Sequence, residues 1–150
     1  MHLLNTALSE VSRLIVLAYS NPDFSPFSSA DRGKWIRELY PPDRVTVLAP
    51  PNPPPNSADD YTQREYVKRF IRQQRLSVDV VFTSETYGDG FGAHLNVPHR
   101  LVDLRRTRHP ISGTELRSDI HRHRAMLHPT VYQHFVQSVV RCYDVIFEPV

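Results

Sequence analysis

One short segment of the chain combines residue types that bind anions with a spacing that brings them together. Ser112, Gly113 and Thr114 form a turn that opens a helix, and Arg117 follows three residues after Thr114. A helix N-terminus offers unpaired backbone N–H groups and the positive end of the helix dipole, and glycine lets a ligand approach the backbone closely. Residues three apart share one helical face, so Thr114 and Arg117 can reach one ligand. The segment predicts a phosphate-binding helix start; the alternative is an ordinary capped helix with a solvated arginine.

The sequence around this segment is rich in arginine. Seven arginines lie between positions 100 and 124: Arg100, Arg105, Arg106, Arg108, Arg117, Arg122 and Arg124. Guanidinium groups match phosphate oxygens with paired hydrogen bonds. The net charge of the chain is only +2, so this positive charge is local. The stretch indicates a phosphorylated ligand or a nucleic acid, with a solvated basic face as the alternative.

The neighbouring histidines do not have the spacing of a metal site. His121 and His123 are two residues apart, so on a helix they do not face each other. His128 is near, but no cysteine or carboxylate cluster completes a set of ligands. We expect a polar helix surface here and no metal-binding residues in the chain.

Helices and strands alternate before the phosphate segment. Apolar runs indicate strands at 13–19, 45–48, 78–82 and 100–104, and helical spacing or capping residues indicate helices at 3–11, 28–39, 57–71 and 87–95. Three further helical pieces are expected at 114–118, 120–127 and 129–140. Alternation of this kind, with apolar strands, predicts an α/β fold with a doubly wound parallel sheet. Ligands of such sheets bind beyond the carboxyl ends of the strands.

The cysteine content and the apolar pattern of the sequence predict the compartment of the protein. Cys142 is the only cysteine, so no internal disulfide can form, and the cytoplasm is the expected location. We expect neither a signal peptide at the start nor an apolar run long enough to cross a membrane. A homo-oligomer is compatible with the sequence.

Several segments in register resemble one enzyme family. The stretch His109–Arg117 is similar to the carboxyl-terminal signature of the nucleotidyltransferase superfamily, roughly Ile-Ser-Gly/Ser-Thr-x-x-Arg, and in particular to nicotinamide-mononucleotide adenylyltransferases of the NadR type. Val80–Asp89 resembles the family's strand that ends in Ser-Glu-x-Tyr-Gly, and Leu101–Arg106 resembles its Val-Asp-x-x-Arg approach to the signature. Arg32, Trp35 and the segment 37–41 look like a helix of these enzymes. The resemblance spans about residues 3 to 135.

This resemblance implies a Rossmann-like nucleotidyltransferase domain over 1–140 that transfers the adenylyl group of ATP to nicotinamide mononucleotide, giving NAD and pyrophosphate with Mg²⁺. Ser112, Gly113, Thr114 and Arg117 would hold the ATP phosphates, with Thr114 and Arg117 as the catalytic residues. The nucleotide pocket would also include Ser84, Glu85, Tyr87, Arg105, Arg106 and Ile111.

The chain departs from the family pattern at both ends. The family's His-x-Gly-His motif, which follows its first strand, is not in this sequence, and Met1 aligns just beyond it. We therefore expect that first strand to be missing, which would leave the strands at 14–18 and 78–82 without a shared neighbour. Residues 141–150 are expected to be a tail or a strand, and no glycine-rich phosphate loop of a kinase domain is present.

Three other functions remain open from the sequence. The chain could transfer adenylyl or cytidylyl groups to a different phosphorylated acceptor, since the phosphate motif does not define the acceptor. It could be a non-catalytic nucleotide-binding or regulatory module, which the absent histidines favour. Nucleic-acid binding through the arginines is the least favoured, and it would require an affinity that falls steeply with salt.

Overall fold

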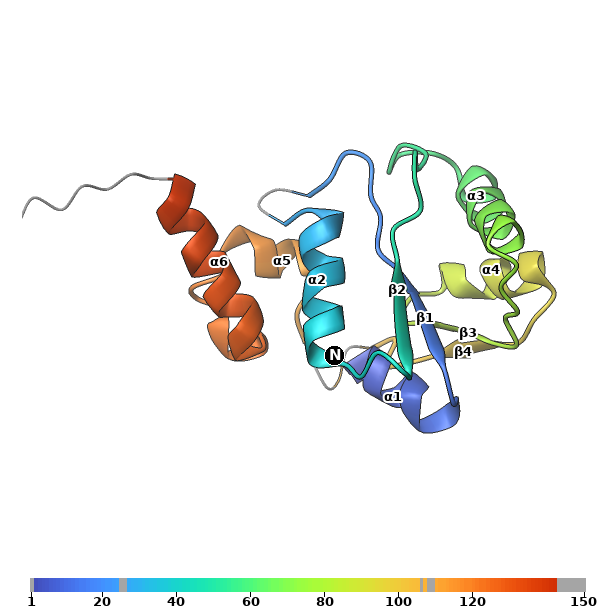
Figure 1. Ribbon diagram of the computed structural model, residues 1–150, viewed down its shortest axis with the longest axis horizontal. Helices are drawn as coiled ribbons and strands as arrows, with labels where there is room; N and C mark the ends of the chain where they lie inside the picture. Colours follow the sequence, from blue (N-terminus) through green and yellow to red (C-terminus); the bar gives the residue numbers. More distant parts are fainter. Residues whose placement is uncertain (1, 25–26, 106, 108–109, 143–150) are drawn as a thin grey trace, which may run out of the picture. The chain divides into compact units, whose positions relative to one another are not determined.

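The computed structural model describes residues 2–24, 27–105, 107 and 110–142. The chain divides into two compact units, residues 1–108 and 109–150. The boundary between them lies inside the range expected to form one domain. Figure 1 shows the order of the elements.

The first unit alternates helices with short strands. Its elements are α1 (His2–Glu10), β1 (Leu14–Leu17), α2 (Ser29–Leu39), β2 (Val45–Leu48), α3 (Asp60–Gln73), β3 (Val81–Thr83), α4 (Tyr87–Leu95) and β4 (His99–Leu101). The second unit is helical where it is described, with α5 (Gly113–Ser118), a 3₁₀ turn η1 (Arg124–Met126) and α6 (Pro129–Cys142). The predicted α/β class is confirmed.

The strands form two small parallel sheets. β1 pairs with β2, Leu14 opposite Val45, and β3 pairs with β4, Val81 opposite His99. The predicted parallel pairing is therefore confirmed, whereas a single doubly wound sheet is not seen among the described residues. The strands at 14–17 and 81–83 belong to different sheets.

Side-chain caps fix the starts of two helices. Ser28 caps α2 and forms a capping box with Asp31, and Asp59 caps α3 by accepting a hydrogen bond of 2.9 Å from the Thr62 backbone N–H. Short polar side chains at this position satisfy N–H groups that the helix cannot pair. The predicted starts of α2 and α3 agree with these caps to within about three residues.

The strands are shorter than the apolar runs that predicted them. β3 starts only at Val81, although the apolar run begins at Val78, and β4 ends at Leu101 although strand was expected to Leu104. Asp103 adopts a left-handed backbone with φ 50°, which ends the extended run. The helix expected over 120–127 is reduced to the single turn η1.

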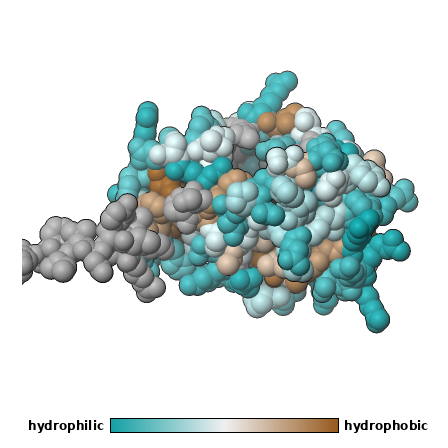
Figure 2. Space-filling view, turned by 90° about the horizontal axis from the view of Figure 1, so that it is seen from above, coloured by the Kyte–Doolittle hydropathy of each residue, from teal (hydrophilic) through white to brown (hydrophobic). Residues whose placement is uncertain are grey.

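Small apolar side chains make up most of the core of the first unit. The buried hydrophobic residues described there are Ala7, Ala18, Phe27, Tyr40, Val45, Val67, Phe70, Val81 and Val102. All four residues of β1 are only half-buried. Figure 2 shows a largely hydrophilic face with small separate apolar areas. Within the described helices, none is long and apolar enough to cross a bilayer.

Two polar links fasten α1 to the sheet that follows it. The Arg44 guanidinium, at the start of β2, donates to the backbone carbonyls of Leu8 and Val11 at 2.8 Å each. The Tyr40 hydroxyl donates to the Asn5 side chain at 2.8 Å. The Arg44 link satisfies carbonyl groups near the end of α1, and the Tyr40 link holds the middle of the helix.

Candidate functional site

The predicted phosphate segment forms the start of α5. Ser112 is the N-cap residue: its hydroxyl accepts a hydrogen bond from the Glu115 backbone N–H at 3.0 Å. In return the Glu115 carboxylate accepts from the Ser112 backbone N–H at 2.7 Å. This reciprocal pair is a capping box, and it satisfies two N–H groups at the helix start. The hydroxyl of Ser112 is therefore engaged within the chain.

The side chains of Thr114 and Arg117 meet on one face of α5. Arg117 donates to the Thr114 hydroxyl at 3.3 Å, which places both side chains on one face of α5. A Cβ added at Gly113 would lie 3.1 Å from the Arg117 guanidinium, so the glycine leaves room for this arginine over the helix start. No described residue accepts a hydrogen bond from the backbone N–H of Gly113 or Thr114. These two amides and Arg117 are the groups that an anion can contact.

The electrostatics of this helix start are mixed. Arg117 and the helix dipole attract an anion, whereas the Glu115 carboxylate already occupies the positive end of the dipole. An incoming phosphate would meet this negative charge within the first turn. Glu115 would therefore lower the affinity of this helix start for an anion.

The other predicted pocket residues fall in both units. Ser84 and Glu85 follow β3, half-buried and exposed respectively. Tyr87 begins α4, and its side chain lies outside the described part of the structure. Arg105 is exposed, Arg106 lies outside the described residues, and Ile111 is half-buried in the second unit.

A polar relay centred on the buried His99 side chain, and including Thr83, the residue before Ser84 in the sequence, was not predicted. The His99 side chain is only 6 % exposed; its Nδ1 lies 2.8 Å from the Asp89 carboxylate and its Nε2 lies 2.7 Å from the Thr83 hydroxyl. The Thr83 hydroxyl also lies 2.8 Å from the Glu85 carbonyl oxygen. The relay therefore joins β4, β3, α4 and the turn that carries Ser84.

Two glycines of α4 make room for this relay. A Cβ at Gly88 would lie 2.2 Å from His99 Nε2 and 2.3 Å from Thr83 Oγ1, and one at Gly92 would lie 2.9 Å from His99 Cβ. Gly88 and Gly92 are four residues apart and so share a helical face. This i, i+4 spacing of glycines is the signal in the sequence that could have indicated a close approach.

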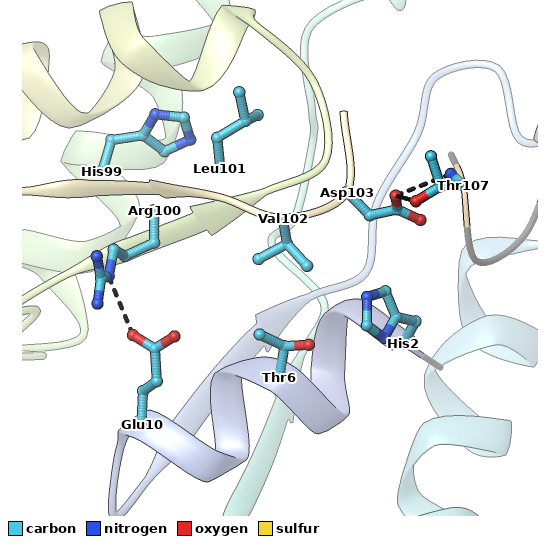
Figure 3. A pocket seen from close by; sticks show the side chains of 9 residues that line it. All are labelled: His2, Thr6, Glu10, His99, Arg100, Leu101, Val102, Asp103 and Thr107. Atoms are coloured by element: carbon cyan, nitrogen blue, oxygen red, sulfur yellow. Dashed lines mark hydrogen bonds and ion pairs between the residues drawn. The ribbon is translucent and has the colours of Figure 1, made fainter. Parts of the chain in front are cut away.

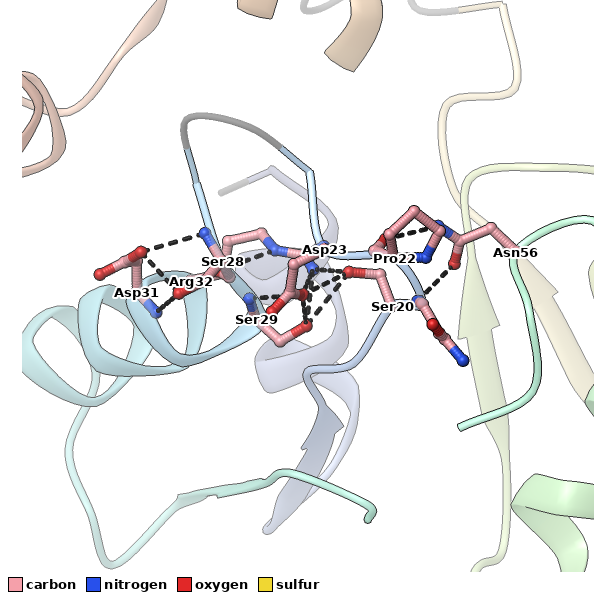
Figure 4. A network of polar contacts seen from close by, with 9 residues as sticks. Ser20, Pro22, Asp23, Ser28, Ser29, Asp31, Arg32 and Asn56 are labelled. Atoms are coloured by element: carbon pink, nitrogen blue, oxygen red, sulfur yellow. Dashed lines mark hydrogen bonds and ion pairs between the residues drawn. The ribbon is translucent and has the colours of Figure 1, made fainter. Parts of the chain in front are cut away.

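A second polar cluster follows the carboxyl end of β1 (Figure 4). The Asp23 carboxylate accepts from the hydroxyl groups of Ser29 and Ser20, the latter at 2.7 Å. Arg32 donates to Ser20 at 2.7 Å and to Ser29 at 3.0 Å, and it lies 3.7 Å from Asp23. The hydrogen bonds from Ser29 and Ser20, and the charge of Arg32, lower the pKa of Asp23. The cluster neutralises Arg32 and orders the loop.

This loop is also tied to the proline-rich segment 50–56. Asn21 and Asn56 exchange hydrogen bonds: the Asn21 N–H donates to the Asn56 side chain at 2.9 Å, and the Asn56 N–H donates to the Asn21 carbonyl at 2.6 Å. The Asn56 side chain donates further to the Pro22 carbonyl at 2.8 Å (Figure 4). The loops after β1 and β2 are thus held together.

A polar cavity of about 480 Å³ lies between α1 and β4 (Figure 3). One wall is the face of α1 that carries His2, Thr6 and Glu10, and the other is formed by β4 and the residues that follow it, from His99 to Asp103, with Thr107. Arg100 donates to Glu10 at 3.0 Å, and Asp103 accepts from the Thr107 backbone N–H at 2.9 Å. The cavity runs along β4 and continues past its carboxyl end.

No group of three or more His, Cys, Asp or Glu side chains that could hold a metal ion is found among the residues described.

The sequence matches no known family model, and a search of curated proteins finds no significant match. The geometry of the chain itself therefore carries the functional argument.

Proposed function

We propose that this chain transfers the adenylyl group of ATP to the phosphate of nicotinamide mononucleotide. The observation that carries the proposal is the start of α5, where Arg117 lies over Gly113 and contacts Thr114 on the same helical face. The open N–H groups of Gly113 and Thr114 complete a set of donors suited to phosphate oxygens. The resemblance of this segment to the nucleotidyltransferase signature supplies the reaction class.

In this reaction a phosphate oxygen of the acceptor attacks the α-phosphorus of ATP. The bond from that phosphorus to the bridging oxygen of the β-phosphate breaks, and pyrophosphate leaves with the electron pair. Negative charge builds up on the leaving group, so fixed donors there lower the barrier. Arg117 and the amides of Gly113 and Thr114 would supply these donors.

Mg²⁺ would accompany ATP rather than occupy a protein cage. The described residues offer no set of three ligands for it, and Mg²⁺ commonly binds through substrate phosphates and waters. When bound it neutralises phosphate charge. The binding of the triphosphate by Arg117 does not require a metal ligand from the protein.

A non-catalytic nucleotide-binding module is the second candidate. Its specific support is the capping box, because the Glu115 carboxylate takes up the Ser112 N–H and places a negative charge at the start of α5. Adenylyl or cytidylyl transfer to another phosphorylated acceptor shares the same phosphate site, and only acceptor competition separates it from the first proposal.

NAD formation from ATP and nicotinamide mononucleotide with Mg²⁺ tests the proposal. The chain would be compared with an upstream-extended form, where the gene encodes one, and with Arg117→Ala. Arg122→Ala is the matched control, since this exposed arginine also lies in the second unit. We expect Arg117→Ala to weaken ATP binding about tenfold or more, because a charge-assisted hydrogen bond contributes about 1.5–3 kcal/mol.

Three outcomes separate the candidates. NAD formation that depends on Arg117 and not on Arg122 supports adenylyl transfer. ATP binding that depends on Arg117 without turnover in either form supports the non-catalytic module. Equal effects of the two substitutions on ATP binding would refute a phosphate site at α5.

A further inference from the structure

The cavity between α1 and β4 has the volume and the polar lining of a ligand site. Figure 3 shows Thr6 and Val102 facing each other across its middle, with the Glu10–Arg100 pair at one end and His2 and Asp103 toward the other. Its volume of about 480 Å³ falls in the range of small-molecule sites, about 300–1,000 Å³. All of these residues belong to the first unit.

The secondary structure explains why these side chains converge. His2, Thr6 and Glu10 are spaced by four residues, so they form one stripe along α1. Arg100 and Val102 alternate with His99 and Leu101 along the extended segment, and Figure 3 shows the two pairs on opposite sides of it. The stripe of α1 and the Arg100–Val102 side thus form the two walls.

The charges of the cavity disfavour a phosphate group. A carboxylate lies toward each end, Glu10 and Asp103, and the described cation Arg100 is already paired with Glu10 at 3.0 Å. At one end Arg100 is already neutralised by Glu10, and toward the other an anion would meet the Asp103 carboxylate. Hydroxyl and amino groups, by contrast, would find acceptors in the carboxylates and in the Thr6 hydroxyl. The apolar side chain of Val102 can contact a ring.

We infer that this cavity binds a nucleoside, through its sugar hydroxyls and base, and not through phosphate. The lining runs along β4 and continues past its carboxyl end to Asp103 and Thr107, and ligands of parallel sheets bind beyond that end of the strands. The binding site depends only on the first unit. Its assignment to a substrate of adenylyl transfer rests on the proposed function.

Titration of the full chain with adenosine, with nicotinamide riboside and with inorganic triphosphate tests the inference. Binding would be followed by calorimetry and by backbone amide NMR shifts. Thr6→Leu fills the middle of the cavity with a good helix former. Ser9→Leu is the matched control, because Ser9 is exposed on the same helix and does not line the cavity. Asp103→Asn removes a charge and keeps an oxygen that accepts from Thr107.

We expect at least one nucleoside to shift the amides of Thr6 and Val102, and Thr6→Leu to weaken that binding at least tenfold while Ser9→Leu leaves it unchanged. Asp103→Asn should weaken it severalfold, and circular dichroism checks that each variant is folded. The inference is overturned if neither nucleoside binds at millimolar concentration, if Thr6→Leu binds normally, or if triphosphate shifts the same amides. Arg117→Ala should leave nucleoside binding intact, so failure of the α5 phosphate site is recognised separately.

Discussion

Replacing Gly88 by alanine places a methyl group in space that the Thr83–His99 pair occupies. The added Cβ would lie 2.2 Å from His99 Nε2, 2.3 Å from Thr83 Oγ1 and 2.6 Å from His99 Cε1. These atoms cannot simply turn away, because the His99 side chain is 6 % exposed and is held by Asp89 on its other nitrogen. The substitution must shift α4 or break the relay.

The net effect follows from three contributions. Alanine in place of glycine favours a helix by up to about 1 kcal/mol. Overpacking a filled site costs about 1–3 kcal/mol, and each hydrogen bond lost from the relay costs about 1 kcal/mol net. We expect Gly88→Ala to lower the free energy of unfolding by about 2 kcal/mol, which changes the folded-to-unfolded ratio by up to about thirtyfold.

Urea unfolding followed by circular dichroism measures this change. Gly33→Ala is the control, because Gly33 also lies in a helix but its added Cβ would be 3.4 Å from the Arg37 guanidinium and from Val47. That variant should be neutral or up to about 1 kcal/mol more stable. If Gly88→Ala were as stable as Gly33→Ala, the close relay would be refuted.

Two more predictions concern charge. Glu115→Gln keeps an oxygen for the capping box but removes the negative charge at the start of α5. The affinity for triphosphate, measured by calorimetry, should therefore rise about two- to fivefold, because a charge near a helix end contributes about 0.3–1 kcal/mol. An unchanged or lower affinity would contradict the phosphate site at α5. The pKa of Asp23 is lowered in the fold, so its contribution to stability is present above about pH 4 and is lost as the pH falls through the folded pKa. Asp23→Asn should therefore flatten the acid-side decline of the urea midpoint, whereas the exposed control Asp43→Asn should not; equal pH profiles for the two variants would count against the cluster.

Local patterns in the sequence predicted most of the elements of the first unit. The strand at 45–48 and the helix at 87–95 agree with the structure at both ends, because each is bounded by strong local signals such as Pro41 and Pro42 before β2. Asn96 ends α4 in the left-handed conformation, which asparagine tolerates better than most residues. Capping and apolar spacing act within a few residues, so a sequence displays them directly.

Contacts between distant residues were not predictable in the same way. His99 and Thr83 lie 16 positions apart in the sequence. Only the fold shows that the imidazole ring and the hydroxyl are within hydrogen-bonding distance, in the space next to Gly88. At α5 the sequence predicted Ser112 as a phosphate-binding residue, and the structure shows that its hydroxyl oxygen also accepts a hydrogen bond from the Glu115 N–H. The same residue types serve a capping box and an anion site, so the motif alone does not distinguish them. The roles of Ser112, Gly113, Thr114 and Arg117 in phosphate binding stay predictions.

The residues of β1 are less buried than their sequence predicts. Four consecutive apolar residues, Leu14–Leu17, are typical of a parallel strand covered on both sides, yet each of the four is only half-buried. Leu14 and Ala18 donate their N–H groups to the β2 side, so by the alternation of a parallel pair Ile15 and Leu17 direct theirs to the opposite edge. A strand added at that edge would satisfy these groups and bury more of β1. The half-buried state of β1 therefore follows from its place in a sheet that has two strands among the described residues.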